Sequence, residues 1–356
     1  MRPIRGRGIS ESPANRFERH HVEEDADALE ELRHVDPEFL LPKPKTEFFR
    51  DDSQSIISRN ASPDIGFSAS LNPYRGCEHG CAYCYARPYH EYLGFNAGLD
   101  FESKIMVKPR AAELLADELA KRSWQPQVLA CSGVTDCYQP VERKLRTTRA
   151  CLEVLRDFRN PVAMITKNHL ITRDADLLGD LAQHGAAAAV ISITSLDSGL
   201  ASQLEPRASA PKFRLDAVRQ LSAAGIPTGV SLAPVIPGLN DHEMPSILEA
   251  AADCGARFAF YTIVRLPYGV KELFASWLEE HVPGQKEKVL GRIREMRGGK
   301  LNDSDFGRRM TGEGRVAESI ATMFKVARRK FGLDKAPFEL STKAFRKISP
   351  GQMELF

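Results

Sequence analysis

Residues 162–194 read VAMITKNHLITRDADLLGDLAQHGAAAAVISIT, and this stretch decides the fold. It begins with an apolar run at 162–167, continues through an amphipathic segment at 174–185, and returns to an apolar run at 188–194. The amphipathic segment ends in Gly185, and a glycine after the last periodic position is typical of a helix end. The stretch therefore predicts a strand, a helix and a second strand, the repeating unit of a parallel sheet.

The same alternation extends in both directions along the chain. Further strand-like runs occupy 128–133, 228–236 and 258–266, and further helix-like segments occupy 110–122, 141–159, 213–225 and 244–255. Near-continuous apolar strands that alternate with amphipathic helices predict a parallel sheet covered by helices. The pattern gives about six strand–helix units, fewer than a closed eight-stranded barrel needs. In such folds the chemistry gathers at the carboxyl ends of the strands.

The composition is that of a globular protein with reduced thiols. The chain has 356 residues, of which 42% are hydrophobic and 27% charged, so there is material for a sizeable core. Seven cysteines are too few for a disulfide framework, and an odd number cannot all be paired. The opening residues MRPIRGRGIS lack the apolar core of a secretory signal, and the longest apolar run, at 185–193, is too short to span a bilayer. We therefore expect a cytoplasmic protein without a membrane segment.

Charge and composition divide the chain into three regions. Residues 1–66 are rich in proline and charge and are expected to be extended or poorly structured. Residues 67–284 contain the strand–helix alternation. Residues 285–356 are expected to be helical and hold 17 Lys+Arg against 9 Asp+Glu, a net charge of +8, whereas the rest of the chain carries −6. This basic region suggests a polyanionic partner.

Residues 77–84 read CEHGCAYC, a C-x-x-x-C-x-x-C pattern with no fourth cysteine beside it. A structural zinc site needs a fourth ligand, which His79 or His90 would have to supply. A [4Fe–4S] cluster held by three thiolates instead keeps one iron open for a substrate or cofactor. Catalytic metal sites keep such an open position and structural sites close it. The cluster is the favoured interpretation, and a non-catalytic zinc-binding interaction module is the alternative.

This loop resembles that of the radical S-adenosylmethionine (SAM) enzymes, whose pattern C-x-x-x-C-x-aromatic-C matches Cys77, Cys81, Tyr83 and Cys84. The resemblance implies a partial (β/α)6 barrel and a [4Fe–4S] cluster held by the three cysteines. It also implies that the open iron binds SAM, which is cleaved to methionine and a 5′-deoxyadenosyl radical. An electron donor such as a flavodoxin or a ferredoxin is then required.

Within the superfamily, residues 68–268 most resemble spore photoproduct lyase and its relatives. The cluster loop continues as Cys-x-Tyr-Cys-Tyr in both, and ACSGVTD at 130–136 is similar to the Cys-Thr-Ser-Asp of those enzymes, with a small insertion. A lysine after the third strand and hydroxyl residues on the fourth match as well. The residues that the resemblance assigns to SAM binding are Tyr83, Ser132, Asp136, Lys167, Ser192 and Thr194.

The chemistry of SAM agrees with these residue types. SAM carries a carboxylate and a ribose diol, which suit a cation and hydroxyl groups at strand ends. Arg207 is a second candidate for the carboxylate, and Glu205 is a candidate for the ribose or the amine. Val235 and Ile236, in a proline-rich turn, are candidates for an apolar wall beside the adenine.

The resemblance also implies a catalytic relay through Cys131, Tyr83 and Tyr85. In spore photoproduct lyase the matching cysteine returns a hydrogen atom to the product radical, and the matching tyrosines help to regenerate SAM. The insertion after Ser132 and the different N- and C-terminal regions argue against transferring the spore lesion itself as the substrate.

The chain ends in QMELF, which resembles the pentapeptide by which bacterial repair and replication proteins dock on the sliding clamp. In that interpretation Leu355 and Phe356 enter an apolar groove and Gln352 makes polar contacts at its mouth. Together with the basic region, this terminus favours DNA as the substrate, and hence a role in DNA repair with a lyase-like reaction. A radical SAM enzyme that modifies a small molecule, RNA or a protein is the alternative.

Overall fold

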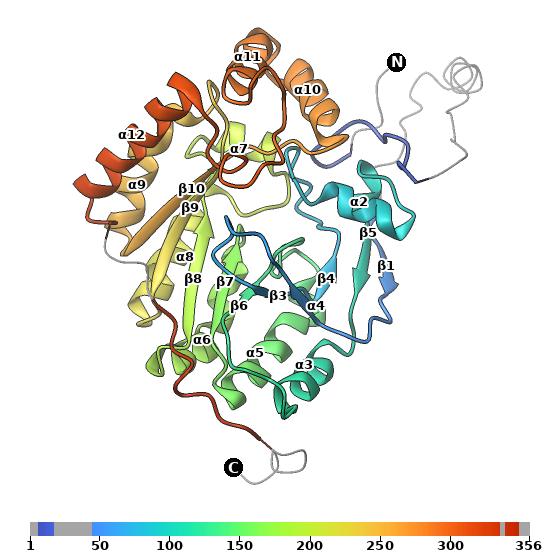
Figure 1. Ribbon diagram of the computed structural model, residues 1–356, viewed down its shortest axis with the longest axis vertical. Coiled ribbons are helices and arrows are strands. Elements are labelled where there is room, and N and C mark those ends of the chain that lie inside the picture. Colours follow the sequence, from blue (N-terminus) through green and yellow to red (C-terminus); the bar gives the residue numbers. More distant parts are fainter. Residues whose placement is uncertain (1–5, 18–44, 335–338, 349–356) are drawn as a thin grey trace.

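The computed structural model describes residues 6–17, 45–334 and 339–348, and its centre is a seven-stranded sheet (Figure 1). The strand order is β10-β9-β8-β7-β6-β3-β2. The strands are β2 (Ile57–Arg59), β3 (Ala69–Leu71), β6 (Leu129–Cys131), β7 (Val162–Thr166), β8 (Ala187–Ser192), β9 (Thr228–Val235) and β10 (Phe258–Ile263). Every neighbouring pair from β3 to β10 is parallel, and only β2 runs antiparallel to its neighbour. The predicted partial (β/α)6 barrel is confirmed.

Five helices connect these strands and cover one face of the sheet. They are α3 (Ala111–Ala120), α5 (Thr147–Phe158), α6 (Ala175–Gln183), α8 (Pro211–Ala223) and α9 (Met244–Asp253). The glycines predicted to end α6 and α8, Gly185 and Gly225, have φ angles of 66° and 77°. A residue with a Cβ is strained in this left-handed conformation, so glycine is the residue that ends these helices without cost.

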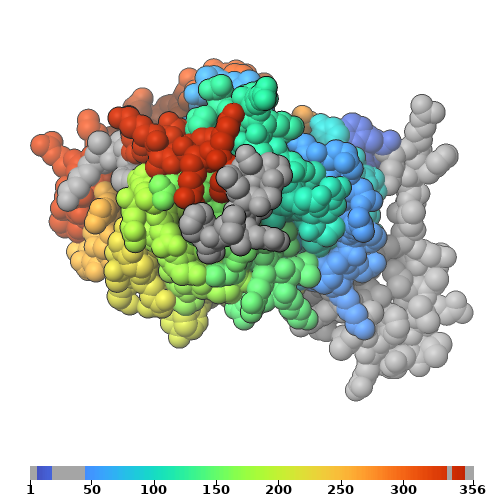
Figure 2. All heavy atoms as spheres, turned by 90° about the horizontal axis from the view of Figure 1, so that it is seen from below, coloured from blue at the N-terminus to red at the C-terminus, as the bar shows by residue number. Residues whose placement is uncertain are grey.

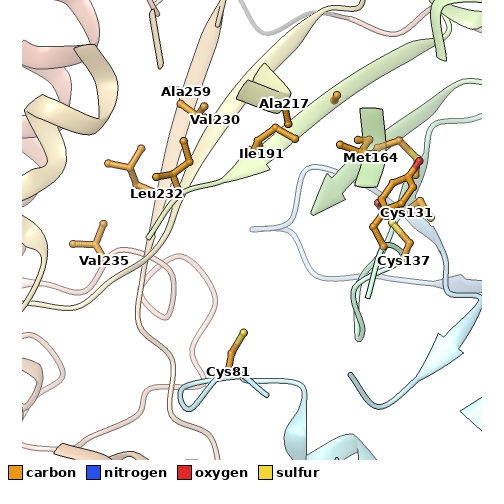
Figure 3. Close-up of a cluster of buried hydrophobic side chains, with 14 of the residues drawn as sticks. Cys81, Cys131, Cys137, Met164, Ile191, Ala217, Val230, Leu232, Val235 and Ala259 are labelled. Carbon is orange, nitrogen blue, oxygen red and sulfur yellow. Dashed lines mark hydrogen bonds between the residues drawn. The ribbon is translucent and has the colours of Figure 1, made fainter. Parts of the chain in front are cut away.

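The two faces of the sheet differ in what they contact. Cys131, Met164 and Ala189 are in register on neighbouring strands and therefore share a face. This face packs on the helices in a continuous core, in which Figure 3 draws Ala217 of α8 next to Ile191 of β8. On β7 the alternate positions, such as Ile165, are only partly buried. They line the interior of the barrel.

A second, smaller sheet supports the cysteine loop. It has the order β1-β5-β4, with β1 (Glu47–Arg50), β4 (Tyr74–Arg75) and β5 (Lys104–Val107), and it lies beside the main sheet in Figure 1. The loop leaves β4 and returns through the 3₁₀ helix η1 (Arg87–Leu93) and α2 (Leu99–Ser103) to β5. Both ends of the loop are thus held by one sheet. Within residues 1–66, β1 and β2 are the strands of the described part.

Helices follow the last strand. They are α10 (Val270–His281), η4 (Pro283–Gln285), α11 (Lys286–Glu295) and α12 (Gly314–Lys330). Two of them, α11 and α12, lie within the region 285–356 that was expected to be helical. Phe324 of α12 packs on Tyr261 of β10, with ring centroids 4.7 Å apart, so α12 covers the edge strand of the sheet.

The segment 339–348 then crosses the amino ends of the strands. The backbone N–H of Ser341 donates to the Gly185 carbonyl at 2.8 Å, and that of Arg346 donates to the Phe158 carbonyl at 2.9 Å. Figure 2 shows this segment, in red, on the face seen from below. The last described residue therefore lies opposite the carboxyl ends of the strands.

Three local features differ from the sequence prediction or extend it. The helix predicted over 141–159 is two helices, α4 (Glu142–Leu145) and α5, because Arg146 between them is left-handed with a φ of 52°. Short elements without a clear periodicity were not predicted, namely η2 (His169–Asp174), α7 (Ser198–Leu204) and η3 (Asp241–Glu243). In the part of the chain that the structure describes, no helix combines the length and the apolar character needed to cross a membrane.

Candidate active site

The cysteine loop, residues 77–84, lies at the carboxyl ends of the parallel strands. The backbone N–H of Glu78 donates to the Gln139 side chain, after β6, at 2.8 Å. The N–H of Ala82 donates to the carbonyl of Leu204, after β8, at 3.0 Å. The loop is therefore fixed against two segments that follow strands, at the end of the sheet where the sequence predicts chemistry.

The three thiols of this loop are free and close together. Cys77 and Cys81 are buried, Cys84 is partly buried, and none forms a disulfide. Burial raises the pKa of all three thiols, and the neighbouring Cys84 contributes to the raised pKa of both Cys77 and Cys81. Three unpaired thiols on one short loop are the donor set that a [4Fe–4S] cluster with one open iron takes, so the residues fit this group.

The two histidines considered as a fourth ligand have other partners. His90 Nε2 lies 2.9 Å from the Lys104 carbonyl oxygen, and burial lowers the pKa of His90 to about 4. His79 lies between Asn168, at 3.2 Å, and Asp136, at 3.4 Å. Among the described residues no three His, Cys, Asp or Glu side chains form a group that fits a single metal ion.

Arg87 clamps the cysteine loop from inside the protein. Its guanidinium is fully buried and pairs with the Glu102 carboxylate at 2.9 Å. It also donates to the carbonyls of Gly80, at 3.2 Å, and Cys81, at 3.1 Å, and further donors reach Ala97 and Gly98. The rigid fork of arginine suits such a multiple contact. The path of the loop around Cys81 therefore depends on one buried ion pair.

A buried polar network surrounds Tyr83. Its hydroxyl donates to the Glu205 carboxylate, and Thr194 donates to the same carboxylate at 2.5 Å. Arg214 forms a buried ion pair with Glu205. Burial alone would raise the pKa of Glu205, but the charges of Arg214 and Lys167 hold this pKa below its usual value. Glu205 is therefore an anion with three protein partners, and it positions Tyr83 and Thr194.

Lys167 follows β7 and faces the same space. Its ammonium lies 5.9 Å from the centroid of the Tyr83 ring, and its backbone N–H donates to Asp136 at 2.9 Å. Asp136 also accepts from Thr166 at 2.7 Å. Burial opposes ionisation of Asp136, but His79 and these hydrogen bonds lower its pKa to about 2. Asp136 fixes the start of the segment that carries Lys167.

The remaining predicted SAM contacts are placed less uniformly. Ser192 lies on the interior face at the end of β8, since Ile191 beside it faces the helices. Ser132 donates to the Thr135 carbonyl at 2.6 Å within its own loop. Arg207 forms an ion pair with Glu78 at 2.6 Å. The apolar residues proposed for the adenine wall, Val235 and Ile236, are buried at the end of β9.

In the described part of the chain, the hydroxyls of Tyr83 and Tyr85 bond residues other than Cys131 and each other. Cys131 shares the helix-covered face of the sheet with Met164. Burial raises the pKa of Cys151 on α5, and the neighbouring Cys131 thiol raises this pKa further, so the two thiols are neighbours. Figure 3 accordingly draws Cys131 beside Cys137 and Met164, with Cys81 on a separate loop. Tyr85 is instead 43% exposed, and its hydroxyl donates to the Gly133 carbonyl at 2.6 Å.

Four charged residues of the site were missed by sequence reasoning: Glu78, Arg87, Glu102 and Arg214. All four are buried. Buried charges are rare unless they are paired, but a sequence does not reveal which arginine or glutamate will be buried. Only Arg87 had a local signal, because it follows Cys84 by three residues and must therefore lie close to the cysteine loop.

Comparison with known proteins identifies relatives of this chain. A sequence model described as the radical SAM superfamily matches residues 71–251. An uncharacterized protein of Mycobacterium bovis is 34% identical over 234 residues, which cover 65% of this chain and 68% of that protein. A protein of Pseudomonas phage M6 named radical SAM Nα-GlyT isomerase is 24% identical over 237 residues, which cover 65% of this chain and 47% of that protein.

Among solved structures, the fold is similar to that of spore photoproduct lyase complexed with dinucleoside spore photoproduct. The TM-score is 0.57 with 15% sequence identity, over 80% of this chain and 79% of that chain. At this identity the likeness concerns the fold.

Proposed function

Because this chain belongs to the radical SAM superfamily, whose members use a [4Fe–4S] cluster and SAM, we propose that it is an enzyme acting on a base or base lesion of DNA. Two observations support the nucleic-acid substrate. The fold is similar to that of a spore photoproduct lyase solved with a dinucleoside lesion, and residues 285–356 carry a net charge of +8. The observation that supports the radical chemistry is the loop with two buried thiols and one partly buried thiol at the carboxyl ends of six parallel strands.

The chain's own residues then have distinct tasks. Cys77, Cys81 and Cys84 hold the cluster, and Lys167 offers its ammonium to the SAM carboxylate. The further proposed SAM contacts are Tyr83, Ser132, Asp136, Ser192, Thr194, Glu205 and Arg207. When bound, the cluster and SAM supply reductive cleavage of SAM and a radical that abstracts hydrogen. A flavodoxin or a ferredoxin is the proposed electron donor.

Replacing Lys167 by methionine is expected to weaken SAM binding roughly tenfold to a hundredfold, because a hydrogen bond to a charged group contributes about 1.5–3 kcal/mol. Lys167→Arg should restore part of the affinity. The measurement is equilibrium binding of SAM to protein with equal cluster content. The exposed Lys212→Met is the matched control and should bind normally. Unchanged affinity in Lys167→Met would remove Lys167 from the SAM site.

The proposed relay through Cys131, Tyr83 and Tyr85 needs the Cys131 thiol to turn from the α5 side towards the barrel interior. If it does so, Cys131→Ala should keep the cluster and SAM cleavage but lower the product yield or divert it to by-products. Cys151→Ala removes the neighbouring thiol from the same core and should leave the product profile unchanged. An unchanged profile in both variants would mean that Cys131 only packs.

The proposed sliding-clamp contact through Gln352, Leu355 and Phe356 lies outside the described residues. What supports it is the terminal QMELF sequence and the contact of Arg346 with the Phe158 carbonyl, which places the end of the described chain at the amino ends of the strands. A short peptide that orders on binding is expected to bind weakly.

Truncating either Leu355 or Phe356 to alanine should cost about 2 kcal/mol or more of clamp affinity, about a thirtyfold loss, because buried apolar anchors carry most of a peptide's binding energy. The measurement is titration of the intact protein and of the terminal peptide against purified bacterial sliding clamp. Gln352→Ala should lose less. DNA binding and SAM cleavage should persist in the Leu355→Ala/Phe356→Ala protein. No binding of the wild-type peptide at high micromolar clamp would remove this proposal.

The nucleic-acid proposal is tested by SAM cleavage in the presence of different substrates. Reduced holoenzyme is incubated with damaged or undamaged DNA, with RNA, or with protein and small-molecule extracts. We expect DNA to raise the rate and to be changed in the process. Stimulation by a protein or a small molecule, with DNA inert, would favour the alternative substrate class instead. Deleting residues 285–356 would not test nucleic-acid binding alone, because Ile320 and Phe324 in this region belong to the hydrophobic core and their loss would disturb the fold.

A further inference from the structure

Exposed aromatic side chains concentrate at the mouth of the barrel. Nine large aromatic residues are exposed among the described residues, and six of them form what we call the aromatic surface. Its members are Phe17, Tyr85, Tyr89, Tyr92, Tyr268 and Phe306. Their exposed fractions run from 43% for Tyr85 to 67% for Tyr92. Exposed apolar side chains gathered in one region mark a candidate interaction site.

Arg16 joins one half of the aromatic surface, which consists of Phe17, Tyr92 and Tyr268. The guanidinium carbon of Arg16 lies 3.8 Å from the ring centroid of Tyr268 and 5.1 Å from that of Phe17. The rings of Phe17 and Tyr92 are 5.0 Å apart. Tyr268 is held in a left-handed conformation, with a φ of 49°, which is uncommon for a residue other than glycine. Such positions concentrate at ligand-binding sites.

The other half of the aromatic surface also pairs aromatic rings with arginines. The guanidinium carbon of Arg265 lies 5.3 Å from the ring centroid of Tyr85, and that of Arg309 lies 4.6 Å from the ring of Phe306. Burial lowers the pKa of Arg265, and the positive charge of Arg309 lowers it further, so the two cations are neighbours. Arg309 also pairs with Asp64 at 2.6 Å, across the open edge of the partial barrel between β10 and β2.

Two segments connect the halves. Tyr89 and Tyr92 lie three residues apart on the 3₁₀ helix η1, where side chains at this spacing lie one above the other. Arg265 and Tyr268 lie in the same connection between β10 and α10. In Figure 1 this connection and η1 lie on the side of the molecule where the carboxyl ends of the strands point.

The cations of this region have spare hydrogen-bond donors. Within the described residues, Arg265 Nε has no hydrogen-bond partner, and its Nη1 reaches only the Met310 sulfur, at 3.9 Å. The buried Arg297 likewise has no partner there for Nε and Nη1, while its Nη2 donates to the Val264 carbonyl at 2.7 Å. These unpaired donors are buried atoms, so what a phosphodiester group at the surface meets is the positive charge of the partly exposed Arg265 side chain.

We propose that the aromatic surface binds an unpaired stretch of nucleic acid, with bases stacked on the exposed rings and the backbone phosphate at Arg265. The inference rests on the proposed function and adds the form of the substrate and the residues that hold it. Exposed rings interleaved with arginines form the sequence-tolerant stacking platform of single-strand binding. In a duplex the faces of the bases are covered by their neighbours, so these rings need bases that are out of the stack.

The position of Tyr85 links this surface to the chemistry. Tyr85 directly follows Cys84, and its hydroxyl donates to Gly133 in the loop after β6. A base stacked on the Tyr85–Arg265 pair therefore lies at the entrance to the site that holds the cluster. The rest of the surface extends away from this entrance, along η1 and the β10–α10 connection.

The test uses holoenzyme and two fluorescent oligonucleotides of equal length, oligodeoxythymidine and an abasic strand with the same phosphates but no bases. Tyr92→Ala and Phe306→Ala should each weaken oligodeoxythymidine binding roughly fivefold to a hundredfold, the scale of one base–aromatic stack. Binding of the abasic strand should change little. Tyr92→Phe should bind normally, and so should Phe213→Ala, an exposed aromatic on α8. Arg265→Met should weaken both strands and reduce the salt dependence.

Three outcomes would overturn the inference. If both alanine variants bind oligodeoxythymidine like wild type, the surface is not a stacking platform, although the proposed function stands. If the alanine variants lose both strands equally while still binding SAM, the rings do not contact bases. If wild-type holoenzyme binds neither strand but DNA duplex still stimulates SAM cleavage, unpaired nucleic acid is the wrong form. Absence of any nucleic-acid effect would remove the proposed function as well.

Discussion

A Cys81→Ala protein is expected to lose SAM cleavage altogether. Cys81 is one of three thiols on a single loop, and its carbonyl is held by Arg87, so its side chain has a fixed place in the site. With two thiolates left, the loop no longer supplies the ligand set of the cluster. We expect the iron content after anaerobic reconstitution to fall, and 5′-deoxyadenosine formation from SAM to fall below detection. Cys77→Ala and Cys84→Ala should behave alike.

Cys254→Ala is the matched control for this experiment. Cys254 is also a buried free cysteine, but it caps the end of α9 away from the loop. It should keep full iron content and activity. His90→Gln should also keep its iron, since His90 bonds a backbone carbonyl. Normal SAM cleavage by the Cys81→Ala protein would contradict the assignment of the cluster.

The second large effect is expected from Arg87→Met, measured on stability. The change removes the ion-pair partner of the buried Glu102 carboxylate, which keeps only the backbone N–H donors of Arg7 and Gly8 and the charge of Arg7. It also frees four carbonyl groups from their donor. Removing one partner of a buried ion pair typically costs about 3–5 kcal/mol. Urea unfolding of the cluster-free protein measures this cost without contribution from iron. The altered loop should also reduce cluster incorporation.

Two comparisons make this measurement specific. Arg110→Met breaks an exposed ion pair with Glu113 and should leave the unfolding midpoint nearly unchanged. Arg87→Met/Glu102→Gln removes the stranded charge and should regain part of the lost stability. If Arg87→Met were as stable as the Arg110→Met control, Arg87 would not be the clamp of the loop.

The fold was predictable from the sequence wherever the signal is local. The strands β7 and β8 and the helix between them follow from apolar runs of five or six residues and from Gly185. The small sheet was not predicted, because β4 has two residues and β1 and β5 have four each, too few for a periodicity. These strands exist because they pair with each other, and pairing is a property of the tertiary fold.

In the site, too, the features that depend on local sequence were predictable and those that depend on the tertiary fold were not. The cysteine spacing is a local pattern, and the structure places its three thiols together. The partners of Tyr83 could not be predicted, because Glu205 and Thr194 come from distant segments that the barrel brings to the loop. The side of the sheet on which Cys131 lies depends on strand register. A shift by one residue would turn its thiol to the opposite face, and a single sequence does not determine this register.

The most direct test of the central claim follows hydrogen from the nucleic acid. Reduced holoenzyme is incubated with SAM and with single-stranded or damaged DNA that carries deuterium on its bases, and 5′-deoxyadenosine and recovered SAM are analysed by mass spectrometry. The account predicts that deuterium appears in one or both of these molecules, that it requires Cys81, and that it decreases in the Tyr92→Ala and Phe306→Ala proteins. SAM cleavage at an undiminished rate without any deuterium from DNA would contradict the claim that this enzyme acts on a base.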